Sequence, residues 1–203
     1  LMKGTPGSGK TMIAKRVPTI LPDMTREEII ESTMLYSVAG YMNFIVNRRP
    51  FRSPHHTASS ASIIGGGAIP KPGEISLAHN GVLFMDEFPE YRADVIEALR
   101  QPLEDGEVVV TRAKSVAKFP AKFMLIASQN PCPCGYYGDK EIECTCSMNQ
   151  IVNYNKKISG PIMDRIDIRI DVPRVKIEEL MSKEEGESSK KIKERVSKTA
   201  QIQ

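Results

Sequence analysis

Eight residues near the start of the chain have the types and spacing of a phosphate-binding loop: Gly4-Thr5-Pro6-Gly7-Ser8-Gly9-Lys10-Thr11. They fit the pattern G-x-x-x-x-G-K-[ST], in which glycines let successive backbone N–H groups point at phosphate oxygens. The helical-looking segment Met12–Val17 follows at once and would add the positive end of its dipole. Lys10 can reach the β- and γ-phosphates, and Thr11 can offer its hydroxyl to Mg²⁺. The pattern predicts nucleotide binding by residues 4–12.

Two adjacent carboxylates, Asp86 and Glu87, end the apolar run that begins at Gly81. An aspartate at the end of a buried strand can hold Mg²⁺, usually through water. The neighbouring glutamate can orient and deprotonate an attacking water. Many strands end in a carboxylate, so the assignment depends on the distance of about 75 residues from the phosphate-binding loop in an α/β pattern.

Two further polar residues are candidates for the same chemistry. Asn130 ends the next apolar strand, where its amide could position water near the γ-phosphate, although an Asn before Pro131 is also a common turn former. Arg165 could reach the γ-phosphate of a neighbouring subunit and stabilise charge in the transition state. A salt bridge of Arg165 with Asp164 or Asp167 is an equally good interpretation of that residue.

Four cysteines form two C-x-C pairs separated by nine residues: Cys132, Cys134, Cys144 and Cys146. Such pairs can supply four thiolates to a structural, tetrahedral Zn²⁺, whereas four unligated thiols on a long surface loop are the alternative. His55 and His56 have no third ligand nearby in the sequence, so loop contacts or ring packing account for them better than metal binding.

A basic segment lies between the strand that ends in Asp86-Glu87 and the strand that ends in Asn130. Val108–Thr111 and Val116–Phe119 predict a hairpin, and Arg112, Lys114 and Lys118 place positive charge on it. Phosphate contact with nucleic acid and a solvated hairpin are both consistent with this pattern.

The elements that must position these residues follow from periodicity and turn signals. Apolar runs at 81–87 and 123–128 predict buried parallel strands, and Ile166–Val172 alternates like a strand with one wet face. Thr25 and Glu28 predict a helix that begins with a capping box, and 93–103 predicts a short amphipathic helix. Residues 40–80 are turn-rich, which indicates a functional segment or an insertion. We expect an α/β fold with a core over 1–175 and a charged helical connection over 176–203.

Composition is that of an ordinary soluble chain: of 203 residues 40% are hydrophobic and 26% charged, with a net charge of +3. This net charge alone does not indicate nucleic acid, and no apolar run is long enough to predict a membrane span. The predicted nucleotide site points to the cytosol, where ATP is available and disulfides are uncommon. We therefore expect a cytoplasmic location and clustered cysteines that are thiols or metal ligands.

With these motifs in order, the chain resembles an AAA+ ATPase of the magnesium-chelatase-like branch, the ComM/YifB group. The phrases that carry the resemblance are Arg49–Thr57, Gly65–Gly67 with Pro72–Gly81, and Asn130–Gly135, and it covers nearly the whole chain. It implies a three-layer αβα P-loop core with a parallel sheet, a helix-2 insert at 40–80 and a pre-sensor-1 hairpin at 108–119. It also implies a truncated first strand, a missing Lon-protease-like amino-terminal domain and a largely absent carboxy-terminal lid.

The resemblance implies a role for each site residue. Lys10 and Thr11 match Walker A, Asp86 and Glu87 match Walker B, Asn130 matches sensor 1, and Arg165 matches an arginine finger acting in trans. The implied protein is a homo-oligomeric, commonly hexameric ring that hydrolyses ATP with Mg²⁺. It would drive branch migration on single-stranded or branched DNA during natural transformation. The alternatives are a chelatase-type motor that remodels a metal-insertion complex, and an ATP-dependent assembly switch without translocation.

Overall fold

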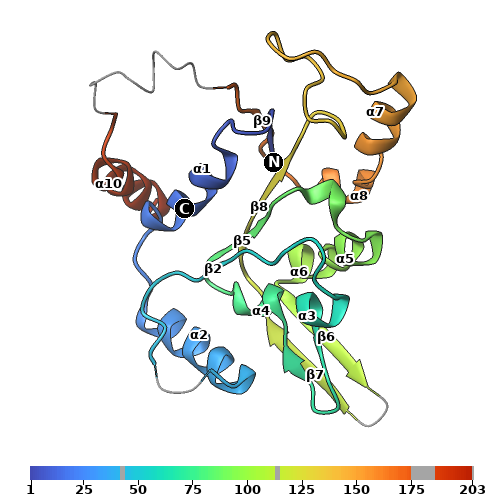
Figure 1. The fold of residues 1–203 in the computed structure, drawn as a ribbon. Coiled ribbons are helices and arrows are strands. Elements are labelled where there is room, and N and C mark those ends of the chain that lie inside the picture. Colours follow the sequence, from blue (N-terminus) through green and yellow to red (C-terminus); the bar gives the residue numbers. More distant parts are fainter. Residues whose placement is uncertain (42–43, 113–114, 175–185, 203) are drawn as a thin grey trace.

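The computed structural model of the chain describes residues 1–41, 44–112, 115–174 and 186–202 (Figure 1). The strands are β1 Met2–Lys3, β2 Phe51–Arg52, β3 Gly65–Gly66, β4 Lys71–Pro72, β5 Val82–Met85, β6 Glu107–Arg112, β7 Ser115–Pro120, β8 Met124–Gln129 and β9 Ile170–Asp171. The α-helices are α1 Lys10–Arg16, α2 Arg26–Ala39, α3 Ser60–Ile64, α4 Glu74–Leu77, α5 Ala93–Ala98, α6 Arg100–Asp105, α7 Met148–Asn155, α8 Gly160–Met163 and α10 Ser189–Ala200. Two 3-10 turns are η1 Val17–Thr19 and η2 Phe88–Glu90.

A five-stranded sheet in the order β2-β5-β8-β1-β9 forms the centre of the molecule, and every pairing in it is parallel. This confirms the predicted α/β fold with a parallel sheet. β1 lies between β8 and β9, while the next strand in the chain, β2, lies at the far edge. Because the carboxyl ends of parallel strands meet at one edge, the loops after β1, β8 and β5 are neighbours in space.

The core has two sides because successive residues of β5 point to opposite faces of the sheet. Leu83 and Met85 are fully buried against a cluster that includes Val95 of α5. Phe84 is fully buried on the other face, in a cluster with Ala14 of α1. Figure 1 shows the same arrangement, with α1 on one side of the sheet and α5, α6 and α8 on the other. The molecule therefore has the three αβα layers that the sequence predicts.

Two predicted elements differ in the structure. The helix expected over 93–103 is divided into α5 and α6 at Leu99. Pro102 explains the break, because a continuous helix would bring its ring against the carbonyl of Ala98 and leave that carbonyl without a donor. In α6 the proline falls in the first turn, where a missing N–H is tolerated.

The strand expected over Ile166–Val172 is reduced to β9, Ile170–Asp171. The Ile166 N–H instead bonds to the Met163 carbonyl at 3.2 Å and continues the turn after α8. β9 forms where β1 is available as a partner, since Ile170 N–H donates to Leu1 O at 2.9 Å and Val172 N–H to Lys3 O at 2.7 Å. The alternation of apolar and polar residues over 166–172 could not show which part of this segment would pair with β1.

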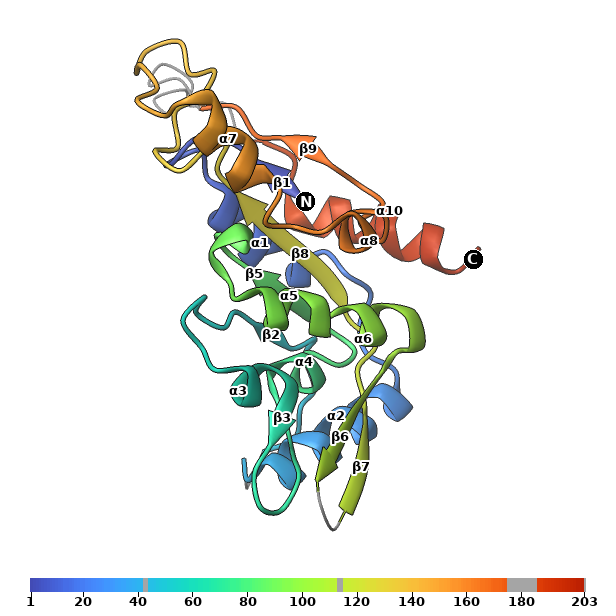
Figure 2. The same cartoon turned by 90° about the vertical axis from the view of Figure 1, so that its right-hand side faces the viewer.

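The predicted hairpin is present as the antiparallel pair β6–β7, which projects from the body of the molecule beside the smaller hairpin β3–β4 (Figure 2). The two hairpins touch, because a Cβ added at Gly65 would lie 3.3 Å from Val110 Cγ2. Among the described helices, none is long and apolar enough to cross a membrane.

The predicted capping box of α2 is present, with Thr25 N–H donating to Glu28 at 2.8 Å and Glu28 N–H donating to Thr25 at 3.2 Å. The buried face of α2 carries Leu35, which packs in the main core, and Tyr36, whose hydroxyl donates to the Leu77 carbonyl at 3.1 Å. Capping signals are local and therefore visible in a sequence, whereas the choice of buried face depends on what the helix packs against.

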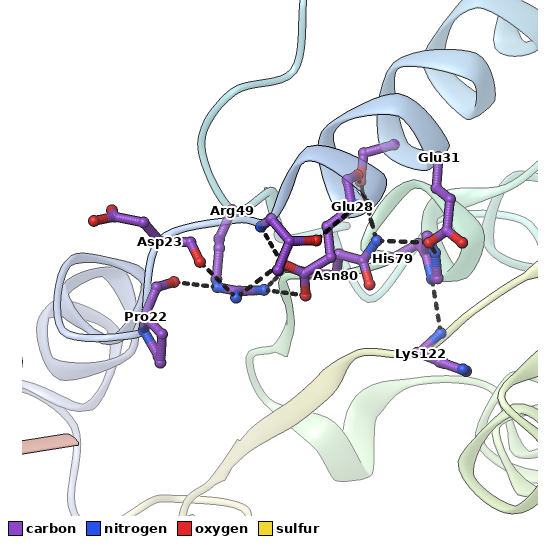
Figure 3. Close-up of polar contacts among 10 residues, drawn as sticks. Pro22, Asp23, Glu28, Glu31, Arg49, His79, Asn80 and Lys122 are labelled. Carbon is purple, nitrogen blue, oxygen red and sulfur yellow. Dashed lines mark hydrogen bonds and ion pairs between the residues drawn. The ribbon is translucent and has the colours of Figure 1, made fainter. Parts of the chain in front are cut away.

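Arg49 ties the start of α2 to the loop before β5 (Figure 3). Its Nε donates to Pro22 O at 2.6 Å and its Nη1 to Asn80 O at 2.8 Å. Nη1 and Nη2 also reach both carboxylate oxygens of Glu28, at 3.1 and 3.2 Å. A planar guanidinium can serve all of these acceptors at once, which a lysine cannot.

Replacing Arg49 by Met is expected to lower the free energy of unfolding by about 2–3 kcal/mol, because Glu28 and the carbonyls of Pro22, Asp23 and Asn80 lose a shared, mostly buried donor. Thermal unfolding followed by circular dichroism measures this. Arg48→Met is the matched control, since Arg48 is the exposed neighbour. Equal midpoints for the two variants would contradict the role given to Arg49.

Candidate active site at the carboxyl edge of the sheet

The phosphate-binding loop connects β1 to α1, as its motif predicts. Gly9 precedes the helix with φ 85° and Gly7 has φ 79°, both in the left-handed region that favours glycine. A Cβ at Gly4 would lie 2.3 Å from Val172 O, so this glycine lets the loop pass close to β9. The phosphate-binding loop thus packs against the end of β9 and leads directly into α1.

Lys10 is 92% buried, with 8% of its surface exposed, and its ammonium lies inside the loop. Nζ donates to Gly4 O and Thr5 O, both at 2.8 Å, and lies 3.4 Å from Asn130 Oδ1. Burial lowers the pKa of Lys10, while the nearby Asp86 and Glu87 carboxylates act in the opposite direction. A cation is therefore held among carbonyls at the same edge as the two carboxylates.

Asp86 is hydrogen-bonded on both carboxylate oxygens. Thr11 Oγ1 donates to Oδ2 at 2.8 Å, and the Ser128 hydroxyl makes a short hydrogen bond to Oδ1. Glu87 N–H also donates to Oδ1, at 3.2 Å. The structure thus brings together the threonine after β1 and the carboxylate after β5, two residues that lie 75 positions apart.

Glu87 has φ 52° and ψ 46°, a left-handed conformation that costs a non-glycine residue about 1–2 kcal/mol. This backbone turns its half-exposed carboxylate toward His56, whose Nδ1 lies 3.3 Å from Oε2. The Tyr91 hydroxyl donates to Pro54 O at 2.5 Å and so holds the segment that directly precedes His55 and His56. Strain of this kind is maintained where the position of a side chain matters.

Asn130 directly follows β8, between the loops after β1 and β5. Arg165 lies at the end of α8, where its guanidinium pairs with Glu104 of α6 and donates to Pro161 O at 2.5 Å. Its Nε is buried and has no hydrogen-bond partner among the described residues. The salt bridge of Arg165 is therefore made across two helices, and not with Asp164 or Asp167.

The four cysteines converge, with all four Sγ atoms within 4.8 Å of one another. Cys132 Sγ lies 3.3 Å from Cys134 Sγ and 3.7 Å from Cys144 Sγ, and Cys134 and Cys144 are 3.5 Å apart. All four are free thiols in the structure. Nine residues of intervening loop fold back so that the two C-x-C pairs meet.

The predicted nucleic-acid contacts are only partly described. Lys118 lies on β7 and pairs with Glu107 at 2.8 Å, so its charge is shared across the hairpin. Arg112 ends β6, and Lys114 lies outside the described residues. Within the described part of the hairpin, Lys118 is therefore a cation with an acidic partner on the opposite strand.

Two residues of the site were not recognised from the sequence. Ser128 is the penultimate residue of β8, and a buried polar residue at the carboxyl end of a strand was the available signal. His56 was expected to make loop contacts or to pack its ring, and its ring centroid lies 4.2 Å from that of His55. Its contact with Glu87 had no signal, because the two residues meet only through β2 and β5 pairing.

A parallel sheet with a phosphate-binding loop after an inner strand and paired carboxylates after a strand two positions away defines the core of a P-loop nucleoside triphosphatase of the AAA+ type. The chain belongs to the family described as magnesium chelatase, subunit ChlI, whose model matches residues 1–180.

Named relatives support the same assignment. Competence protein ComM of Haemophilus influenzae is 47% identical over 206 residues, which is 100% of this chain and 40% of the relative. The uncharacterized protein YifB of Escherichia coli is 44% identical over 97% of this chain and 39% of its own length. The magnesium-chelatase 67 kDa subunit of Chlorobaculum parvum is 24% identical over 64% of this chain and 19% of its own. The chain thus spans about two fifths of the length of its nearer relatives.

Proposed function

We propose that this chain is the ATP-hydrolysing core of a ring-forming motor that acts on DNA. The observation that carries the proposal is the joining of Thr11 to Asp86 at 2.8 Å, with Lys10 and Glu87 at the same edge of the sheet. The same edge of the sheet then carries a cation that can bind phosphate, two side-chain oxygens that can bind a metal ion, and a carboxylate that can accept a proton from water. Hydrolysis of ATP to ADP and phosphate needs these groups together.

Lys10 and the loop N–H groups would bind the phosphates of ATP. Thr5 Oγ1 is buried without a hydrogen-bond partner among the described residues, which leaves a polar atom in the loop for a ligand. Thr11 and Asp86 fit Mg²⁺, because their adjacent oxygens are the hard donors that this ion takes and they lie beside the phosphate loop. When bound, Mg²⁺ neutralises charge on the phosphate oxygens.

Glu87 would accept the proton of the attacking water, with its carboxylate oriented by His56. Asn130 would position that water, since its amide lies next to Lys10 at the end of β8. Arg165 would act on the γ-phosphate of a neighbouring subunit in a ring, after release from Glu104. In this scheme one subunit supplies the loop and the carboxylates, and the next supplies the arginine.

DNA is the proposed substrate of the motor, in recombination of incoming DNA in the cytoplasm. Support comes from the relative named competence protein, which is 47% identical over the whole chain, against 24% over 64% of it for the magnesium-chelatase subunit. The projecting hairpin with Arg112 and Lys114 is the proposed phosphate contact, in keeping with its place outside the core (Figure 2).

The test is ATP hydrolysis by the full-length protein with and without single-stranded and branched DNA. We expect DNA to raise the rate, and we expect the double change Arg112→Glu with Lys114→Glu to abolish the increase, because phosphate contacts become repulsions. Lys190→Glu with Lys191→Glu, on exposed positions of α10, makes the same change in net charge away from the hairpin and should keep the increase.

Unchanged stimulation in the hairpin variant would remove the hairpin from the proposal. A basal ATPase that DNA does not change would favour a chelatase-type motor that remodels a protein complex. The two outcomes are distinguishable. The first would exclude only the hairpin as the DNA contact, whereas the second would exclude DNA as the substrate.

A further inference from the structure

The cysteine cluster has the dimensions of a tetrahedral metal site. Zn–S bonds of about 2.3 Å give Sγ–Sγ edges of about 3.8 Å. The observed separations are 3.3, 3.5 and 3.7 Å, and all six pairs lie within 4.8 Å. We propose that Cys132, Cys134, Cys144 and Cys146 bind one structural Zn²⁺, and that this centre holds the phosphate-binding loop and Asn130 in place.

Backbone N–H groups around the sulfurs support thiolate ligands. Tyr137 N–H donates to Cys132 Sγ and Cys134 N–H donates to Cys146 Sγ, both at 3.3 Å. Backbone N–H groups that donate to a sulfur stabilise its negative charge and orient it as a ligand. A disulfide requires an S–S distance of about 2.05 Å, far shorter than these contacts. With all four positions taken by protein ligands, the centre would be structural and not catalytic.

The position of the cluster gives the centre a role in the active site. Cys132 follows Asn130 by two residues, so the first ligand is fixed close to the end of β8. Within the cysteine loop, Gly135 has φ 90° and lies against the phosphate-binding loop. A Cβ at Gly135 would come within 2.7 Å of Pro6 Cγ and 4.0 Å of Asn130 Cγ.

The cysteine loop needs such a tie, because residues 130–147 contain no helix or strand. A segment of this length without helix or strand is uncommon in a compact domain. Some interaction other than backbone hydrogen bonding of a helix or sheet must then order it. A metal ion that joins both ends of the loop would fix Gly135, and through it Pro6. The metal centre would thereby pre-organise the nucleotide site without touching the nucleotide.

Metal content is the first test. Full-length protein purified without chelator is expected to hold about one zinc per chain by plasma mass spectrometry, and thiol-blocking mercurial should release it into a chromogenic chelator. Cys144→Ser should lose the metal and unfold at a lower temperature, whereas Thr145→Ala, at the exposed position between two ligands, should keep it. Less than about a tenth of an equivalent of zinc in the unsubstituted protein, or iron in its place, would overturn the assignment.

The contact with Pro6 is tested by two glycines of the same loop. Gly135→Ala and Gly138→Ala incur a similar backbone cost, because their φ values are 90° and 81°. Only the Gly135 substitution meets another segment, since nothing lies within 4 Å of a Cβ at Gly138. We expect Gly135→Ala to raise the Kd for ATP about tenfold and Gly138→Ala to leave it unchanged, with zinc retained in both.

The role of the centre rests on the proposed nucleotide site, and the readouts keep the two ideas apart. Equal ATP affinity in the two glycine variants would overturn the coupling of the centre to the loop. If the unsubstituted protein fails to bind ATP, the proposed function fails while the zinc content still decides the metal site. Zinc content in Cys144→Ser equal to that of the unsubstituted protein would remove this cysteine from the ligand set.

Discussion

Glu87→Gln is expected to lower ATP turnover by a factor on the order of 10²–10⁴, the usual contribution of a general base, while ATP still binds. Glutamine has nearly the same shape, so the strained backbone at residue 87 and the contact with Asp86 through the Glu87 N–H remain. What is lost is the carboxylate that takes the proton of water. The variant should therefore hold ATP in an assembled ring, measured by phosphate release, binding of a fluorescent ATP analogue and light scattering.

Glu90→Gln is the matched control for this result. It removes the same charge three residues further on, at the end of η2, from a carboxylate that pairs with Lys157 at 3.1 Å. We expect its turnover to equal that of the unsubstituted protein. Wild-type turnover in Glu87→Gln itself would exclude Glu87 from the mechanism and would favour a nucleotide-dependent assembly switch.

Lys10→Met is expected to raise the Kd for ATP by a factor on the order of 10–10², because hydrogen bonds to charged groups contribute about 1.5–3 kcal/mol each. The substitution also leaves Gly4 O and Thr5 O without the donor that they have at 2.8 Å. Calorimetric titration with ATP and Mg²⁺ measures the affinity, and thermal unfolding shows whether the loop has also lost stability.

Lys15→Met separates the local role of Lys10 from a general effect of charge. Lys15 lies on the same helix, α1, and is exposed. We expect this control to bind ATP as the unsubstituted protein does. If Lys10→Met retained the original Kd, phosphate binding by the buried ammonium would be contradicted.

Much of the fold follows from local signals. The strands β5 and β8, the capping box of α2 and the β6–β7 hairpin were all predicted, because each depends on residues close together in the chain. β5 is buried throughout as expected, whereas only the second half of β8 is buried and Met124 at its start is exposed. The divided helix α5–α6 and the short strand β9 were not. The first depended on one proline within a periodic pattern, and the second on a partner strand from the other end of the chain.

The candidate site shows the same division. Motifs identified Lys10, Asp86 and Glu87, since their types and order are constrained by phosphate and metal chemistry. Ser128 and His56 belong to no motif of the sequence, because a serine or a histidine has many roles and becomes informative only beside its partner. Arg165 was left with two interpretations, and its partner Glu104 was in neither of them.

The order of chemical groups along this chain was already sufficient to assign the family and the parallel sheet, and to predict the main residues of a phosphate site. Folding added the pairs between distant segments: Thr11 with Asp86, His56 with Glu87, and Gly135 with Pro6. Such pairs arise where parallel strands place their carboxyl ends at one edge. A sequence states which groups are present, while the distances that set hydrogen bonds and charge interactions exist only after strands far apart in the chain have paired.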